Sequence, residues 1–291
     1  MPGGAELLVG GDSVTAAEQP GGRTGARRTR GGKRGSWSSR AGSIAGITSL
    51  GLGIALWELL GRTVWKDSLW VQPFSQVVTR FRELWSEGRI QPDLIASAKA
   101  YSVGLAIAIV AGLLLGLATA ASKFLNDCFE PYLSIWNATP TVALAPLIIL
   151  VFGLGTTSRV VVVVLVTTIP VILNTRSGIS TTDRKLIEMT SSFGGSRWQV
   201  YRHVSLPNAF PHVLTGIRLA ASYGFIAIVV GELYTGRAGI GVMIRRASER
   251  FDTAALYVGV GLLGIGGCFV TYFLRWLERR LAPWRARQLD D

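Results

Sequence analysis

The sequence predicts an all-α membrane protein that has six transmembrane helices and both termini in the cytoplasm. Three observations lead to this fold class. Hydrophobic residues make up 49% of the 291 residues and charged residues only 16%, with a mean hydropathy of +0.37, whereas soluble domains carry about 25% charged residues. Apolar runs of bilayer length recur along the chain. The net charge of +12 is explained if the cations gather at the cytoplasmic membrane face.

Six segments are expected to cross the membrane. A hydrocarbon core about 30 Å thick and a helical rise of about 1.5 Å per residue require roughly 20 apolar residues per span. Two segments meet this requirement without an ionisable side chain: Ala100–Ser122 and Ala254–Leu274. The other four are Arg40 to about Gly61, Pro131–Phe152, Thr156–Leu173 and Val213–Thr235.

The positive charges orient these spans. Lys and Arg number seven before Ser43, six from Arg176 to Arg218 and five from Arg275 onward. Because cytoplasmic loops carry the excess of cations, these three segments are expected in the cytoplasm. The last outer loop is an exception that topology alone does not explain, since it holds Arg237, Arg245, Arg246 and Arg250.

Composition divides the chain into four parts. Residues 1–42 form a basic tail of Gly, Arg, Ser and Thr, predicted to be disordered, cytoplasmic and uncleaved. Residues 43–91 hold the first transmembrane helix and an extracytoplasmic segment, residues 92–276 form the transmembrane core with a cytoplasmic loop at 174–212, and residues 277–291 form a cytoplasmic tail. The basic tail could bind nucleic acid or anionic lipid, but such tails more often fix orientation beside a first span, and no nucleic-acid partner is expected.

The cytoplasmic loop is expected to contain a first short amphipathic helix. Ser180 followed by Asp183 fits a capping box, in which the two side chains bond the free N–H groups of a helix start. Apolar and aromatic residues then recur at helical spacing: Leu186, Ile187, Thr190 and Phe193.

A second short helix is expected after a break. Gly194-Gly195 supplies a sharp turn, and Ser196 with Gln199 offers another capping box. Pro207 is expected to end the second helix. Such a pair of helices could be gripped by a cytosolic partner or could merely cap the bundle, and the pattern leaves both open.

Three short motifs in this loop keep a fixed spacing: Glu188-Met189-Thr190, then Gly194, then Val204-Ser205-Leu206-Pro207. They resemble the EAA loop of ABC importer permeases, whose pattern is Glu-Ala-Ala, three residues, Gly, nine residues and Ile-x-Leu-Pro. The spacing agrees at every position, and the departures are Met189, Thr190 and Val204. Further segments, Pro140–Gly153 among them, resemble the nitrate, taurine and aliphatic-sulfonate branch, and the resemblance extends from about Arg82 to Arg275.

The resemblance implies the type I ABC importer permease fold and a transport role rather than an enzymatic one. In such importers two permease subunits span a bacterial-type plasma (inner) membrane, cytosolic ABC ATPase subunits bind below them, and an extracytoplasmic solute-binding protein delivers the solute. A lone permease of this branch is usually a homodimer surrounded by membrane lipid. The ATPase-coupling residues carried over from the motif and its helix are Glu188, Met189, Thr190, Phe193, Gly194, Leu206 and Pro207.

The sequence offers no catalytic or metal site and implies no cofactor. No stretch matches Gly-x-x-x-x-Gly-Lys-[Ser/Thr], since the nearest pair, Gly32-Lys33, is followed by Arg34. ATP hydrolysis is therefore expected on a partner subunit. Two Cys and two His supply neither a disulfide framework nor a ligand cluster.

Polar side chains inside the spans are candidates for the solute pathway, because each costs about 2.5 to 3.5 kcal/mol at the bilayer centre unless it faces protein or water. The candidates are Asn137, Thr139, Thr141, Asn174, Ser222, Tyr223 and Glu232. Each has a structural alternative. Ser and Thr can bond the preceding turn of their own helix, Tyr223 can pack between helices, and Glu232 can pair with Arg237 or Arg245.

Two other functions remain as alternatives. An ion-coupled secondary transporter lacks support, because neither paired intramembrane acids nor an obvious inverted repeat is present. A polytopic membrane enzyme would need a ligand or catalytic constellation, and His203 and His212 lack the required spacing. The expected solute is a small anion such as a sulfonate, taurine or nitrate. Gly236-x-x-Gly239-x-Gly241 is expected to be an extracytoplasmic turn that contacts the binding protein.

Overall fold

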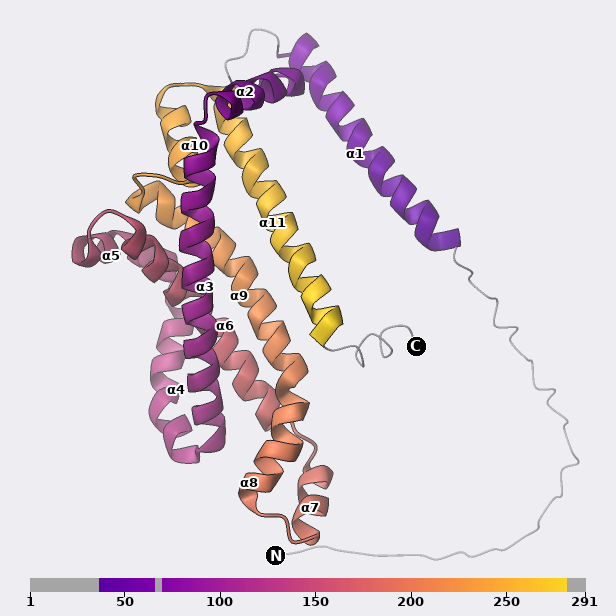
Figure 1. Ribbon diagram of the computed structural model, residues 1–291, viewed down its shortest axis with the longest axis vertical. Helices are drawn as coiled ribbons and strands as arrows, with labels where there is room; N and C mark the ends of the chain where they lie inside the picture. Colours follow the sequence, from indigo (N-terminus) through magenta and orange to yellow (C-terminus); the bar gives the residue numbers. More distant parts are fainter. Residues whose placement is uncertain (1–36, 66–69, 282–291) are drawn as a thin grey trace, which may run out of the picture. The chain divides into compact units, whose positions relative to one another are not determined.

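The computed structural model describes residues 37–65 and 70–281, and in these ranges every regular element is a helix (Figure 1). The elements are α1 (Trp37–Thr63), α2 (Phe74–Ser86), α3 (Ile90–Ala121), α4 (Lys123–Ala138), the 3₁₀ turn η1 (Thr141–Leu144), α5 (Ala145–Phe152), α6 (Thr156–Ser180), α7 (Arg184–Ser192), α8 (Arg197–Val200), the π-helical turn η2 (Tyr201–Ser205), α9 (Leu206–Thr235), α10 (Ile240–Glu249) and α11 (Thr253–Leu281).

The chain divides into two units, residues 1–51 and 52–291. Of the first unit, the structure describes the beginning of α1, and every contact given below lies within the second unit. Most of the predicted basic tail, up to residue 36, lies outside the described residues, as does the predicted C-terminal tail beyond residue 281.

Four helical stretches of the described residues are long and apolar enough to cross a membrane: Ile90–Ala121, Thr156–Ser180, Arg197–Tyr234 and Thr253–Glu278. A fifth is present if α4 and the segment that follows it are taken together. Helix α1 covers the segment predicted as the first span. The membrane-spanning architecture is therefore helical, while six spans and cytoplasmic termini stay predictions.

The predicted span Pro131–Phe152 is not one straight helix. Helix α4 ends at Ala138, and the chain bends by 85° before η1 and α5. Pro140 lies at this break and has no N–H to continue the helical hydrogen bonds. Pro170, by contrast, lies inside α6 without ending it.

Helix α6 is the central helix, since it packs along both α3 and α9. On α3 a residue without a large side chain recurs every fourth position of the buried face: Ala100, Gly104, Ala108, Gly112 and Gly116. A Cβ atom at Gly112 would lie 2.6 Å from the Cβ of Val171 on α6. In lipid, where apolar burial gives little driving force between helices, such close backbone approach provides the packing.

Helix α9 approaches α6 in the same way. A Cβ atom at Gly216 would lie 3.0 Å from the carbonyl oxygen of Pro170, and one at Gly224 would lie 2.7 Å from Cγ2 of Thr167. Helices α3, α6 and α9 therefore form one close-packed core.

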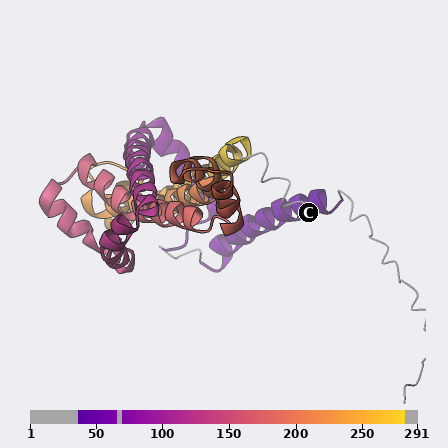
Figure 2. The same ribbon diagram turned by 90° about the horizontal axis from the view of Figure 1, so that it is seen from below.

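The short helices lie at opposite ends of this core. Helices α7 and α8 lie at one end, and α2 and α10 lie at the other (Figure 1). Figure 2 views the molecule from the end that carries α7 and α8. Helix α6 runs to Ser180, beyond Leu173, the predicted end of that span, and helical backbone resumes at Arg197, where the second short helix is expected.

Candidate functional site

The first candidate region is the α7–α8 projection, residues 183–200. Its first helix begins at Asp183, whose carboxylate accepts a hydrogen bond from the N–H of Lys185 at 2.9 Å. The predicted capping box at Ser180 is wrong. Helix α6 extends through this residue, and its hydroxyl donates to the carbonyl of Ser177 within the same helix.

The glycine turn of the projection is confirmed. Gly194 has φ +80°, a conformation that side-chain-bearing residues rarely adopt. The N–H of Gly195 donates to the carbonyl oxygen of Thr190 at 3.0 Å, and a Cβ atom at Gly195 would lie 2.7 Å from that oxygen. Each glycine is therefore needed for a different reason, the first for its conformation and the second for its close approach.

The start of α8 is also confirmed. The hydroxyl of Ser196 accepts from the N–H of Gln199 at 3.3 Å, and the side chain of Gln199 accepts from the N–H of Ser196 at 2.7 Å, which completes the capping box. The predicted helix end at Pro207 is wrong. Helical backbone continues from α8 through η2 into α9, and Pro207 lies in the first turn of α9, where its missing N–H is tolerated.

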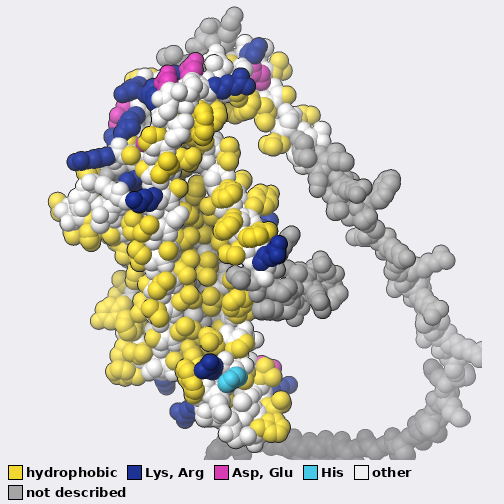
Figure 3. Space-filling model, in the orientation of Figure 1, with side chains coloured by type: hydrophobic (Ala, Val, Ile, Leu, Met, Phe, Trp, Pro, Cys, Tyr) yellow, Lys and Arg dark blue, Asp and Glu magenta, His cyan; other side chains and the backbone are white. Residues whose placement is uncertain are grey.

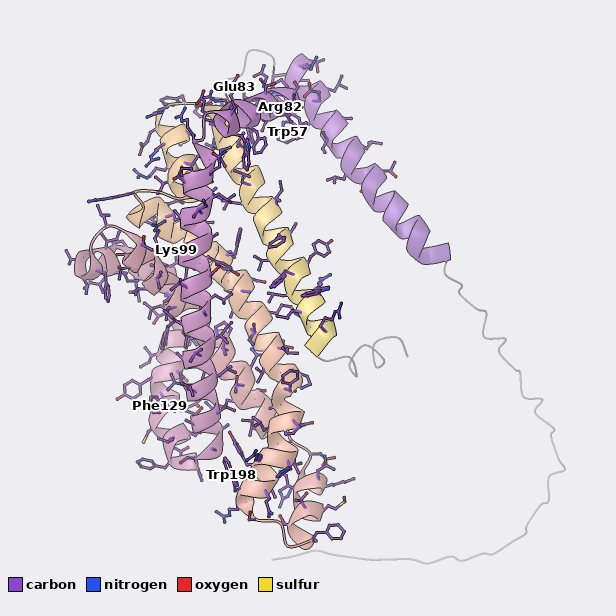
Figure 4. The ribbon with its side chains drawn as sticks, viewed as in Figure 1. Trp57, Arg82, Glu83, Lys99, Phe129 and Trp198 are labelled. Carbon is purple, nitrogen blue, oxygen red and sulfur yellow. The ribbon has the colours of Figure 1, made fainter. Side chains whose placement is uncertain are left out.

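The projection exposes apolar side chains. Every residue of α7 is at least partly exposed, and the exposed fraction reaches 58% for Met189, 85% for Phe193 and 64% for Trp198. Figure 4 shows Trp198 at this end of the molecule. Glu188 pairs with Arg184 on the same helix at 2.9 Å. Clustered exposed apolar groups with charged neighbours are typical of a protein interaction surface.

The predicted pathway residues, apart from Glu232, are mostly bonded within their own segment. The side chains of Thr139, Asn174 and Ser222 each donate to the carbonyl four residues earlier, and Thr141 donates to the carbonyl of Thr139. Asn137, Ser222 and Tyr223 are exposed. Thr139 and Thr141 share a pocket of about 360 Å³ at the bend after α4, lined by apolar and aromatic neighbours such as Trp136.

Glu232 lies in a different environment, because only 1% of it is exposed. Its carboxylate accepts from the hydroxyl of Ser97 at 2.6 Å and from the N–H of Gly241 at 2.9 Å. Nη1 of Arg159 lies 3.5 Å from the same carboxylate. Of the alternatives left open for Glu232, the structure shows an ion pair, but the partner is the buried Arg159 of α6 instead of Arg237 or Arg245.

The glycine-rich turn after α9 packs directly onto this carboxylate. The N–H of Gly239 donates to Asp93 at 2.8 Å, the N–H of Ile240 donates to Ser97 at 2.9 Å, and Arg159 donates to the carbonyl of Ala238 at 2.6 Å. Gly239 has φ +132°, and a Cβ atom there would lie 2.3 Å from the carboxyl of Glu232. We call Asp93, Ser97, Arg159, Glu232 and the backbone of residues 238–241 the buried network.

Sequence reasoning missed three members of the buried network: Asp93, Ser97 and Arg159. Arg159 could have been identified from the sequence, because a cation near the start of an apolar span needs an acidic or polar partner. Asp93 and Ser97 gave none, since their partners lie 146 and 135 residues away in the sequence. The network joins α3, α6, α9 and the turn before α10.

Charged side chains gather beyond the buried network, over α2 and α10 (Figure 3). Arg80 on α2 donates to Asp252 through two nitrogens, at 3.1 and 2.6 Å. Hydrogen bonds to Glu83 and Asp252 raise the pKa of Arg80 above its ordinary value. The pair with Asp252 fixes α2 to the turn that precedes α11.

Known proteins are similar to this chain in sequence and in fold. Residues 104–283 match the family described as the binding-protein-dependent transport system inner membrane component. The formylaminopyrimidine transport permease protein of Halalkalibacterium halodurans is 32% identical over 81% of this chain and 93% of that protein. The taurine transport system permease protein of Escherichia coli is 27% identical over 82% of this chain and 88% of its own length.

A solved structure of the MetNI methionine ABC transporter, in an inward-facing conformation, contains a similar chain. The TM-score is 0.56 at 16% identity, and the match covers 64% of this chain and 92% of the other. At this level of identity the likeness supports the fold.

Proposed function

Because the chain belongs to the binding-protein-dependent transport system inner membrane component family, we propose that it carries a small solute into the cytoplasm through coupling to ATPase subunits at the α7–α8 projection. It is an ABC importer permease of the inner membrane, and its family works with ATPase and substrate-binding subunits. The chain itself supplies the transport path rather than a catalytic site.

The exposed apolar surface of the projection carries this proposal. Exposure to water is unfavourable for large apolar side chains such as Phe193, Met189 and Trp198. A cleft on an ATPase subunit would bury these side chains. The projection is also attached firmly at both sides. Helix α7 follows α6 after residues 181–183, and α8 continues into α9. Movement of the projection would therefore move two helices of the close-packed core as rigid bodies.

The same proposal orients the chain. The projection and its neighbours carry Arg184, Lys185, Arg197 and Arg202, and cations mark the cytoplasmic side. With α1 as the first span and the bent α4–α5 segment as the third, six spans would place both termini on that side. The end that holds α2 and α10 would then face the extracytoplasmic binding protein.

We propose that two copies of this chain enclose the solute path. The exposed or half-exposed polar residues Asn137, Thr139, Thr141, Asn174, Ser222 and Tyr223 would line the path between the copies. Glu232 would instead act on the path indirectly, by holding α9 to α3 and α6 through the buried network.

The proposed solute is a small anion of the sulfonate type. It is supported by the relative that transports taurine and by the arginines around α2 and α10. A formylaminopyrimidine-like heterocycle is the second candidate, because the relative named for that solute is 32% identical. Uptake by proteoliposomes of taurine, an alkanesulfonate, nitrate and a formylaminopyrimidine, each with its cognate binding protein, would separate the two classes.

The coupling proposal is tested by Gly194→Val in the assembled transporter. A β-branched residue at φ +80° costs on the order of 1–3 kcal/mol and distorts the turn. Solute-stimulated ATP hydrolysis by the purified complex is expected to fall to the basal rate. The matched control is Gly261→Val on α11, where a Cβ atom meets open space.

Two results would contradict the coupling proposal. One is full stimulated hydrolysis by the Gly194→Val complex, and the other is solute uptake by the permease in the absence of any ATPase subunit.

A further inference from the structure

Three of the four arginines that break the positive-inside pattern, Arg237, Arg246 and Arg250, line one pocket at the α2 and α10 end. The pocket has a volume of about 440 Å³. Five of its lining residues are arginines from α2, α10 and the adjoining turns: Arg80, Arg89, Arg237, Arg246 and Arg250. We call this the arginine pocket.

The two aspartates that line the arginine pocket already accept hydrogen bonds from other groups of the chain. Asp252 accepts two hydrogen bonds from Arg80 and one from the N–H of Ala255 at 3.0 Å. Asp93 is 7% exposed and accepts from the N–H of Gly239. Glu83 and Glu87 pair with Arg80 and Arg89 at the edge of the pocket, so the remaining positive charge lies on the other arginines that line it.

Two of the arginines have free guanidinium groups. Among the residues that the structure describes, Arg237 and Arg250 have no acidic group within ion-pair distance, and both side chains are exposed. Arg246 lies 3.9 Å from Asp93 with 46% of its side chain exposed. Guanidinium groups in this arrangement suit a carboxylate, which can accept two parallel hydrogen bonds from one arginine.

The backbone segment that carries Arg237 is held in place by the buried network. The flanking backbone is bonded at Ala238, Gly239 and Ile240 to side chains of α6 and α3. A partner that binds here does not have to order a loose loop, so less of the binding energy is lost to conformational entropy.

We propose that the arginine pocket receives an acidic side chain of the extracytoplasmic solute-binding protein. The identity of this partner rests on the proposed function, which places the α2 and α10 end outside the cell. Charge complementarity selects the occupant. Arginine is one of the residues enriched at the anchor points of interfaces, and the apolar lining residues Leu84 and Met243 suit the methylene groups of a glutamate.

The test measures binding of the solute-loaded binding protein to the permease–ATPase complex in phosphatidylcholine nanodiscs. Each of Arg237→Gln and Arg250→Gln is expected to weaken binding by about tenfold, and the double variant more than either, with a shallower dependence of affinity on salt. Arg82→Gln is the matched control, because Arg82 is exposed on α2 (Figure 4) but does not line the pocket. The substituted side chains are exposed, so the melting temperatures should match the parent.

Three results would overturn the proposal. The double variant could bind the partner as tightly as the parent. The variants could lose affinity only for phosphatidylglycerol nanodiscs, which would assign the pocket to a lipid headgroup. Free glutamate or sulfate at millimolar concentration could fill the pocket without competing with the partner. Failure of the proposed function would look different, because the chain would then not copurify with an ATPase subunit at all.

Discussion

The two ends of the molecule each hold an Arg–Glu pair, and the two pairs have opposite surroundings. In the buried network, Arg159 and Glu232 leave 5% and 1% of their side chains exposed and lie 73 residues apart in the sequence. In the α7–α8 projection, Arg184 and Glu188 leave 89% and 63% exposed and lie four residues apart. The first pair joins α6 to α9 within the buried network, whereas the second lies within one helix and leaves that helix free to meet a partner.

This contrast separates stability from function. Removing one partner of a buried pair leaves an uncompensated charge, which costs about 3–5 kcal/mol, whereas an exposed pair contributes about 0–1 kcal/mol. Substitutions at the buried network are therefore expected to destabilise the protein, and substitutions of exposed side chains in the projection to leave it stable but uncoupled from the ATPase.

The largest effect is expected for Arg159→Met. The substitution orphans the carboxylate of Glu232 and should lower the free energy of unfolding by about 3–5 kcal/mol in detergent. Arg184→Met is the matched control and should change it by less than about 0.5 kcal/mol. Chemical unfolding followed by tryptophan fluorescence measures both. Adding Glu232→Gln to Arg159→Met should recover part of the loss, and equal stability of the two single variants would refute the contrast.

A smaller effect is expected for Gly239→Ala. The new methyl group collides with the carboxyl of Glu232, 2.3 Å away, and that carboxyl cannot move without giving up its hydrogen bonds to Ser97 and Gly241. Overpacking of this kind costs about 1–3 kcal/mol. Gly194→Ala, which also has a positive φ but open space around it, should pay only the backbone cost of about 1–2 kcal/mol. Thermal unfolding of the two variants gives the difference, and the reverse order of stability would be evidence against the buried network.

A local effect is expected for Ser196→Ala. Loss of the N-cap bond to Gln199 destabilises the first turn of α8 by about 1 kcal/mol. Hydrogen exchange should show roughly fivefold faster exchange of the Gln199 amide, with global stability unchanged. Gln199→Ala removes the other half of the capping box and should act in the same direction. Unchanged exchange in both variants would mean that the cap does not hold α8.

The smallest effect on stability is expected for Phe193→Ala, despite a large effect on assembly. The side chain is 85% exposed, so the free energy of unfolding should change by less than about 0.5 kcal/mol. Copurification of the ATPase subunit should nevertheless drop sharply. Phe124→Ala at a similarly exposed site on α4 should affect neither. Retention of the ATPase by Phe193→Ala would remove this residue from the docking surface.

The features that sequence reasoning predicted correctly depend on neighbouring residues. The turn at Gly194-Gly195 and the cap at Ser196 are set within a few residues, and their chemistry can be read from spacing. The predicted capping box at Ser180 was wrong because the residues around Ser180 do not indicate how far α6 extends. Packing against α3 and α9 carries that helix seven residues beyond Leu173, the predicted end.

The features that were missed depend on contacts between distant segments. Nothing near Ser97 in the sequence indicates that its hydroxyl bonds Glu232 and the N–H of Ile240. The helix end predicted at Pro207 was wrong because it depended on a part of the fold that the local sequence does not show. A proline ends a helix in its interior but is tolerated in the first turn, and only the structure shows that a π-helical turn precedes it.

That π-helical turn joins α8 and α9 into one continuous helical stretch. The helical stretch from Arg197 to Tyr234 has 38 residues, which corresponds to about 57 Å at 1.5 Å per residue. The helical backbone is continuous over this stretch. Near its first end, the hydroxyl of Tyr201 donates to the carbonyl of Leu117 on α3 at 3.3 Å, which anchors the stretch to the core at that point. If the coupling proposal holds and α8 and α9 tilt as one body about this contact, Trp198 and Glu232 would move in opposite directions, because they lie on either side of it along the helical stretch.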